Sequence, residues 1–168
     1  MSISFLSFIF ILSLSFTSQG AFIEPVTSTP LRPFSINQDY ITDYSFSINV
    51  PSSIKSQGSF EVEFPRPYQL PSTCSAYLKI LDNPFAKFSC EKISSSKYMI
   101  EVGEILLGEY TIVFENIKNP FAYPASSNFK IRTFYNKEVL VDANEYFEAV
   151  PFLPTPGTNP LLSYYVFM

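Results

Sequence analysis

The sequence predicts an all-β fold: a single two-sheet Greek-key sandwich of about seven or eight short strands with one disulfide bond. Aromatic residues make up 17% of the chain, as 18 Phe and 11 Tyr without Trp, and such residues favour strands. The 14 prolines divide the chain into short segments, because proline cannot donate a hydrogen bond to a strand ladder. Several segments alternate apolar and polar residues, and none has a convincing helical period. A small closed barrel is the alternative architecture.

Two clean alternations define the first strands of the predicted domain. The segment 44–50 places aromatic and β-branched side chains on one face, serine and asparagine on the other, and Pro51 ends it. After a turn at Gln57-Gly58, the segment 59–64 sets three apolar side chains opposite three polar ones. The apolar set is Phe60, Val62 and Phe64, and the polar set is Ser59, Glu61 and Glu63.

Shorter segments continue this pattern. We predict further strands over 77–81, 98–102, 110–117, 129–135 and 139–147. The segment 85–91 is ambiguous, and 104–108 is expected to form a tight corner. The alternation turns Phe46, Phe60, Phe64 and Phe114 toward the core.

The last two strands are predicted to form a hairpin around Asn136-Lys137. A three-residue loop pairs Tyr135 with Val139 and Thr133 with Val141. This register matches the apolar faces better than a two-residue loop does, so we predict the three-residue loop.

The first twenty residues have the pattern of a secretory signal peptide. An uncharged apolar stretch runs from Phe5 to Phe16, which suits a signal core and is too short to span a bilayer. The small residues Ser18 and Gly20 predict cleavage after Gly20. An uncleaved N-terminal anchor is the alternative, since no positive side chain precedes the apolar stretch. We therefore expect a secreted protein, extracellular or at the cell surface.

Two cysteines in an exported chain predict one disulfide, between Cys74 and Cys90, because the export route is oxidising. A loop of this length would stabilise the fold by roughly 3 kcal/mol. Two thiolates without histidine supply only half of a tetrahedral zinc site, so we predict no metal site.

The chain divides into four predicted parts. Residues 1–20 form the signal peptide, and residues 21–39 form an extended, loosely attached lead-in. Residues 40–149 form the β-sandwich, and residues 150–168 form a proline-rich, aromatic tail.

The composition argues against most catalytic chemistry. The absence of histidine removes the Ser-His-Asp and Cys-His arrangements, and five glycines hardly supply a phosphate-binding loop. The net charge is -4, and no basic run exists for a nucleic acid or an anionic membrane. We therefore predict no enzyme, no cofactor, no nucleic-acid partner and no stable membrane insertion after signal cleavage.

Carboxylates are the remaining chemical candidates. Glu61 and Glu63 share one face of a strand about 7 Å apart, a spacing that glycosidase carboxylates can have. We interpret them as solvent-facing, because catalytic pairs normally come from different elements. The segment 142–145, and Asp39 with Asp43, offer oxygen ligands for calcium but lack the spacing of a dedicated loop. Ordinary turn chemistry is the preferred interpretation.

The end of the tail is the candidate partner-binding segment. An uncharged aromatic segment left free would be an aggregation hazard. We expect it to pack on its own domain or to add to a neighbour's sheet edge or groove. Its candidate contact residues are Leu161, Leu162, Tyr164, Tyr165, Val166 and Phe167. The segment is too short for a transmembrane helix and fits a lipid-anchor signal poorly.

A set of short motifs resembles a known repeat. The motifs are Tyr110-x-Ile112-x-Phe114-x-x-Ile117-x-Asn119-Pro120, Ser126-Ser127-Asn128-Phe129-x-Ile131-x-Thr133 and Val141-Asp142, with Cys74 and Cys90 ahead of them. They are similar to the Ig-like repeats of large secreted and surface proteins of ciliated protists, over about residues 40–147. The resemblance implies an Ig-like β-sandwich used for extracellular architecture or adhesion, without catalysis.

These features predict a secreted, non-catalytic structural or interaction module that serves as a subunit of an extracellular assembly. Its expected partners are proteins, either copies of itself or other subunits. The alternative is a secreted small-ligand or carbohydrate-binding protein whose aromatic side chains line a pocket or platform.

Overall fold

The computed structural model describes residues 20–26, 31–33, 37–80, 83–121 and 128–148. Its regular structure is entirely β, as the sequence predicts. The strands are β1 (Ala21–Phe22), β2 (Glu24–Pro25), β3 (Leu31–Pro33), β4 (Ile41–Val50), β5 (Ile54–Glu63), β6 (Ala76–Ile80), β7 (Ala86–Ser94), β8 (Lys97–Ile105), β9 (Gly108–Lys118), β10 (Phe129–Tyr135) and β11 (Val139–Phe147). The described residues contain eleven strands rather than seven or eight, and three short ones lie in the predicted lead-in.

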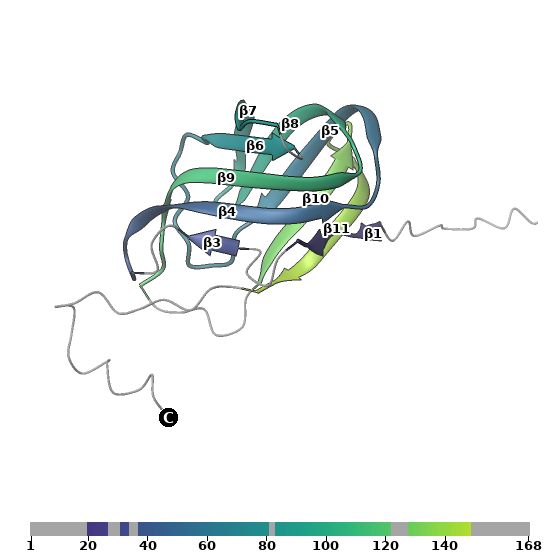
Figure 1. The fold of residues 1–168 in the computed structure, drawn as a ribbon. Helices are drawn as coiled ribbons and strands as arrows, with labels where there is room; N and C mark the ends of the chain where they lie inside the picture. The colour runs from purple at the N-terminus through teal and green to yellow at the C-terminus, as the bar shows by residue number, and fades with distance from the viewer. Residues whose placement is uncertain (1–19, 27–30, 34–36, 81–82, 122–127, 149–168) are drawn as a thin grey trace, which may run out of the picture.

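These strands form one mixed sheet that curls and nearly closes into a barrel (Figure 1). Their order is β1-β11-β10-β5-β8-β7-β6-β9-β4-β2, and β3 pairs with β4 beside this path. β7 joins the two halves, because residues 86–88 pair with β6 and residues 89–94 pair with β8. β1 lies parallel to β11, whereas the other pairs are antiparallel.

Residues 21–26 join the two ends of the sheet, and we refer to them as the N-terminal seam. Within the seam, β1 lies on β11 and β2 lies on β4, with Ile23 fully buried between them. The Ile23 N–H donates to the Ala143 carbonyl at 3.1 Å, and its carbonyl accepts from Asn144 Nδ2 at 2.9 Å. The seam is therefore part of the sheet rather than a loosely attached lead-in, because its apolar residue fills the gap between the sheet ends.

The final hairpin follows the predicted register only near its loop. Tyr135 pairs with Val139 across the three-residue loop, as predicted. Thr133 pairs with Asp142 instead of Val141, because the register shifts between Thr133 and Phe134. The bulge thereby turns Asp142 inward, where the Ser52 and Thr133 hydroxyls donate to its carboxylate at 2.8 and 3.3 Å.

Aromatic side chains fill the interior. The ring of Phe64 contacts six other described rings at centroid distances from 5.3 to 6.2 Å, mostly edge to face. Those rings are Tyr44, Phe46, Tyr68, Tyr98, Phe114 and Phe129. The four phenylalanines predicted to face the core are all buried. Such ring pairs stabilise a core beyond the area that they bury.

A disulfide and a buried hydrogen bond fix the flanks of this core. Cys74, just ahead of β6, is bonded to Cys90 in β7, as predicted, with their Cα atoms 5.4 Å apart. In β4 the Tyr44 hydroxyl donates to Asn119 Oδ1, beyond the end of β9, at 2.5 Å. Burial, together with neighbouring Tyr68, raises the pKa of Tyr44, so its hydroxyl stays protonated and able to donate.

Candidate functional site

The outer face of β5 carries Ser59, Glu61 and Glu63, as the alternation predicts. These side chains are not simply solvated, because Ser59 and Glu61 are only 1% and 7% exposed. β8 and β10 pair with β5 on either side, and their outward side chains cover it. The face thus differs from the open, solvent-facing surface expected from sequence.

An ion-pair network neutralises the two glutamates. Arg132 on β10 donates to both oxygens of Glu145 at 2.5 and 2.7 Å, and to Glu61 at 2.5 Å. Lys97 on β8 lies 3.3 Å from Glu61 and 3.4 Å from Glu63. A two-oxygen contact with arginine fixes the carboxylate geometrically as well as electrostatically.

The network keeps the carboxylate of Glu63 charged. Burial raises the pKa of Glu63, but Lys97, Lys130 and Arg132 outweigh burial and lower its pKa overall. The hydrogen bond from Arg132 to Glu145 raises the pKa of the guanidinium. A glycosidase needs one carboxyl that stays protonated as a general acid, and Glu63 is shifted in the opposite direction.

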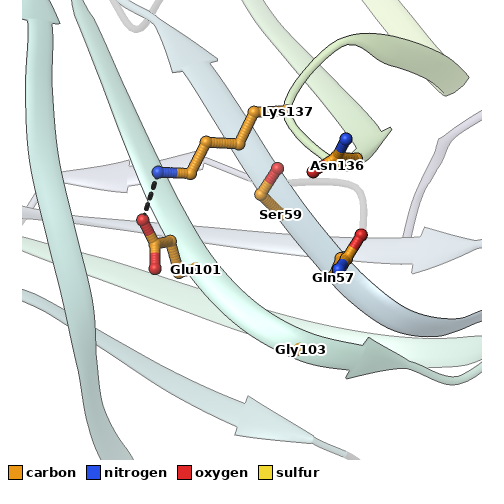
Figure 2. A pocket seen from close by; sticks show the side chains of 7 residues that line it. Gln57, Ser59, Glu101, Gly103, Asn136 and Lys137 are labelled. Atoms are coloured by element: carbon orange, nitrogen blue, oxygen red, sulfur yellow. Dashed lines mark ion pairs between the residues drawn. The ribbon is translucent and has the colours of Figure 1, made fainter.

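Beside this network lies a second feature, which we call the hairpin pocket (Figure 2). It has a volume of about 220 Å³ and is formed by β5, β8 and the turn between β10 and β11. Its lining residues are Gln57, Gly58, Ser59, Glu101, Gly103, Asn136 and Lys137. The pocket is therefore assembled from three segments that are distant in the sequence.

An unusual backbone shapes the hairpin pocket. Gln57, Asn136 and Lys137 have φ values of 54°, 52° and 58°, and Gly103 has 89°. Residues other than glycine rarely adopt this left-handed backbone conformation, and those that are held in it cluster at functional sites. The Asn136 N–H donates to the Gln57 carbonyl at 2.9 Å and ties two of these residues together. A Cβ on Gly58 would lie 2.9 Å from Ile105 Cγ1, so the close approach of β8 requires glycine.

Ser59 is the chemically distinctive residue of the hairpin pocket. Its hydroxyl is buried and has no hydrogen-bond partner among the described residues, and Figure 2 shows it among the lining side chains. Lys137 forms an ion pair with Glu101, and this hydrogen bond raises the pKa of the ammonium group. A protonated Lys137 does not activate a serine, so the arrangement suits ligand binding better than nucleophilic catalysis.

Exposed apolar side chains lie at the same end of the sheet, which we call the hairpin end. Strand pairing places three turns there, since Val50 pairs with Gly108, Ile54 with Ile105, and Tyr135 with Gly58. The apolar side chains in or beside these turns are Leu106, Leu107, Tyr135 and Val139, with exposed fractions of 49%, 67%, 44% and 56%. Leu106 and Leu107 are adjacent in the turn between β8 and β9, and Tyr135 pairs with Val139 across the loop between β10 and β11.

The other candidates from the sequence do not converge. Asp39 pairs with Lys118 at 2.7 Å, and Asp43 accepts from the Asn116 N–H at 3.0 Å. Within 142–145, Asp142 is buried in the interior whereas Glu145 binds Arg132 on the outer face. The described residues include no group of three or more His, Cys, Asp or Glu side chains that could hold a metal ion.

The tail residues predicted to bind a partner lie outside the described residues. They are Leu161, Leu162, Tyr164, Tyr165, Val166 and Phe167. In the described ranges, no helix has the length and apolarity needed to cross a membrane.

Sequence reasoning identified the turns at Gln57-Gly58 and Asn136-Lys137 but missed the hairpin pocket. The two turns lie together because β5 pairs with β10, and no local sequence pattern encodes that pairing.

No protein-family model and no curated protein matches the chain. Among solved structures, one described as "AvmM Catalyzes Macrocyclization in Alchivemycin A Biosynthesis" is similar over 80% of this chain and 100% of its own, with 8% identity. Its TM-score is 0.33, so this similarity carries no argument about fold or function.

Proposed function

We propose that this protein is a secreted, non-catalytic building block of an extracellular assembly, and that copies of the chain contact one another through the hairpin end. The proposal rests on two features that occur together at the hairpin end. The unpartnered hydroxyl of Ser59 lies in a pocket at the same end of the sheet as four exposed apolar side chains. Apolar contacts supply affinity in protein interfaces, whereas a buried polar group that needs a partner supplies specificity.

Two alternative functions have less support. An enzyme needs a proton-transfer group with a suitable pKa. The neighbouring basic side chains lower the pKa of Glu63, so it stays charged. The hydrogen bond with Glu101 raises the pKa of Lys137, so it stays protonated. A carrier of apolar ligands needs an apolar cavity, whereas the rings around Phe64 occupy the interior between the sheet faces. Secretion and an Ig-like relationship of the fold stay part of the proposal and rest on the sequence.

Sedimentation velocity over a range of protein concentrations tests the proposed self-association. We expect Leu107→Glu to weaken association, because it places a charge in the contact without disturbing the core. Ser59→Ala should weaken it as well without reducing stability, because it removes a buried hydroxyl that lacks a partner in the described chain. The control is Ile93→Glu in β7, where Ile93 is 46% exposed and lies outside the hairpin end.

A wild-type chain that stays monomeric at every concentration would contradict the proposal, as would a Leu107→Glu variant that associates like the wild type. Deleting residues 151–168 separately tests whether the tail supplies a contact. Loss of association in the deletion alone would assign the interface to the tail and overturn the assignment to the hairpin end.

A further inference from the structure

A second concavity lies on the same outer face, at the far end of β5. We call it the Tyr146 groove, and it has a volume of about 480 Å³, within the range of pockets that hold small ligands. Glu63 and Arg66 line one side, Asn128 and Lys130 the middle, and Tyr146 the β11 side. Four positions along β5 separate Glu63 from Ser59, or about 13 Å, so the groove is distinct from the hairpin pocket.

Tyr146 presents an unusually open aromatic ring on a fixed strand. Its side chain is 74% exposed, more than the other exposed large hydrophobic side chains of the described chain. Its N–H donates to Asn144 Oδ1 at 2.8 Å, and Asn144 Nδ2 in turn donates to the Ile23 carbonyl at 2.9 Å. The buried amide therefore anchors the main chain beneath the ring. A large, solvent-exposed aromatic ring on a regular strand can stack against a ligand.

The polar groups of the groove are fixed before any ligand arrives. Glu63 lies 3.5 Å from Lys130 and 3.4 Å from Lys97. Glu145 accepts two hydrogen bonds from Arg132. The ion pairs orient these carboxylates, yet each oxygen retains capacity to accept a further hydrogen bond. Fixed acceptors of this kind lower the cost of ordering the site when a ligand binds.

The charges of the groove indicate a neutral ligand. Glu63 and Glu145 line the groove together with Lys130 and Arg66, and Lys97 and Arg132 also pair with the two carboxylates, so neither sign of charge strongly dominates. An anionic ligand would meet the two carboxylates, and a cationic ligand would meet the two basic groups. A neutral ligand with many hydroxyl groups instead finds both acceptors and donors, with the Asn128 amide supplying either.

We propose that the Tyr146 groove binds a neutral saccharide. One face of a sugar ring packs on Tyr146, while its hydroxyl groups donate to Glu63 and Glu145 and accept from Lys130 and Asn128. This activity is independent of self-association through the hairpin end, and it adds a glycan partner to an assembly whose subunits contact one another elsewhere.

Isothermal titration calorimetry of the full chain with defined neutral oligosaccharides tests the proposal. The probes are tetrasaccharides of glucose, mannose, galactose and N-acetylglucosamine, with a sulfated heparin tetrasaccharide for comparison. We expect at least one neutral probe to bind, and Tyr146→Ala to weaken its binding about tenfold or more. Tyr135→Ala, which removes an exposed ring at the hairpin end, is the matched control and should leave the affinity unchanged.

The unfolding midpoint of Tyr146→Ala should equal that of the wild type, because the ring is exposed. The proposal is overturned if no neutral probe binds up to about 10 mM. It is also overturned if Tyr146→Ala binds as the wild type does, or if only the heparin probe binds. Measuring the affinity on the Leu107→Glu variant as well separates this proposal from self-association, because the groove is unchanged in that variant.

Discussion

The hydroxyl of Tyr110 holds both main-chain polar groups of Leu106. It accepts a hydrogen bond from the Leu106 N–H at 2.8 Å and donates one to the Leu106 carbonyl at 2.9 Å. Burial raises the pKa of Tyr110, an effect that the bond to Leu106 opposes and Glu104 reinforces. The hydroxyl therefore stays protonated and fixes the turn that exposes Leu106 and Leu107.

Removing this hydroxyl should loosen that turn. Tyr110→Phe leaves a main-chain donor and an acceptor without their partner, so we expect a loss of about 1–3 kcal/mol in the free energy of unfolding. Urea denaturation measures the loss. Tyr77→Phe on half-buried β6 is the control and should change stability little, and equal effects of the two substitutions would contradict the role of the Leu106 contact.

The ion-pair network should stabilise the fold through Arg132. Arg132→Gln leaves the buried Glu61 with Lys97 as its remaining cationic neighbour, and we expect a loss of about 2–3 kcal/mol. Lys137→Gln breaks the exposed pair with Glu101 and should have little effect, because solvent screens that pair. Chemical denaturation of both variants at pH 7 compares them. Equal losses would mean that the position of Arg132 within the network is unimportant.

Stability should fall in acid partly through Glu63. Its pKa is lowered from 4.5 in the folded state, so its contribution is complete above that value and is lost as the pH falls through the folded pKa. Thermal unfolding between pH 7 and pH 3 should show a smaller acid-induced decrease for Glu63→Gln than for the wild type. Parallel pH profiles would exclude Glu63 as a contributor.

The N-terminal seam should contribute to the stability of the fold as much as a central strand does. Ile23→Ala removes a fully buried side chain, and we expect a loss of about 2–4 kcal/mol. Phe22→Ala removes a larger side chain that is 55% exposed, and should change stability little. Denaturation of the two variants tests whether the seam packs as described. A small effect of Ile23→Ala would show that it does not.

The parts of the fold that follow local alternation could be predicted from the sequence. Phe46 and Phe60 lie in clean period-two segments, and both face the core. The seam was missed because its strands are two residues long and lie in a segment rich in proline and threonine. β7 was ambiguous because it turns from one half of the sheet to the other, and most of its side chains are exposed or half-buried.

The candidate site depended on relationships that a sequence pattern does not contain. The inward position of Asp142 follows from a bulge at Thr133, and the burial of Glu61 follows from Arg132, which is 71 residues away. Ser59 occupies a polar position of a correctly predicted strand, yet its burial depends on how β8 and β10 pair with β5. Local periodicity gives the side on which a residue lies but not what covers it.

The seam also has a consequence for the order of folding. Ile23 and Asn144 are 121 positions apart, so residues made early in synthesis find their partners only after β11 has been made. Contacts over such separations form slowly, because a long loop must close before they contribute stability. We therefore expect the sheet to close last. Until it does, the edges of β4 and β11 stay open to pairing with other chains.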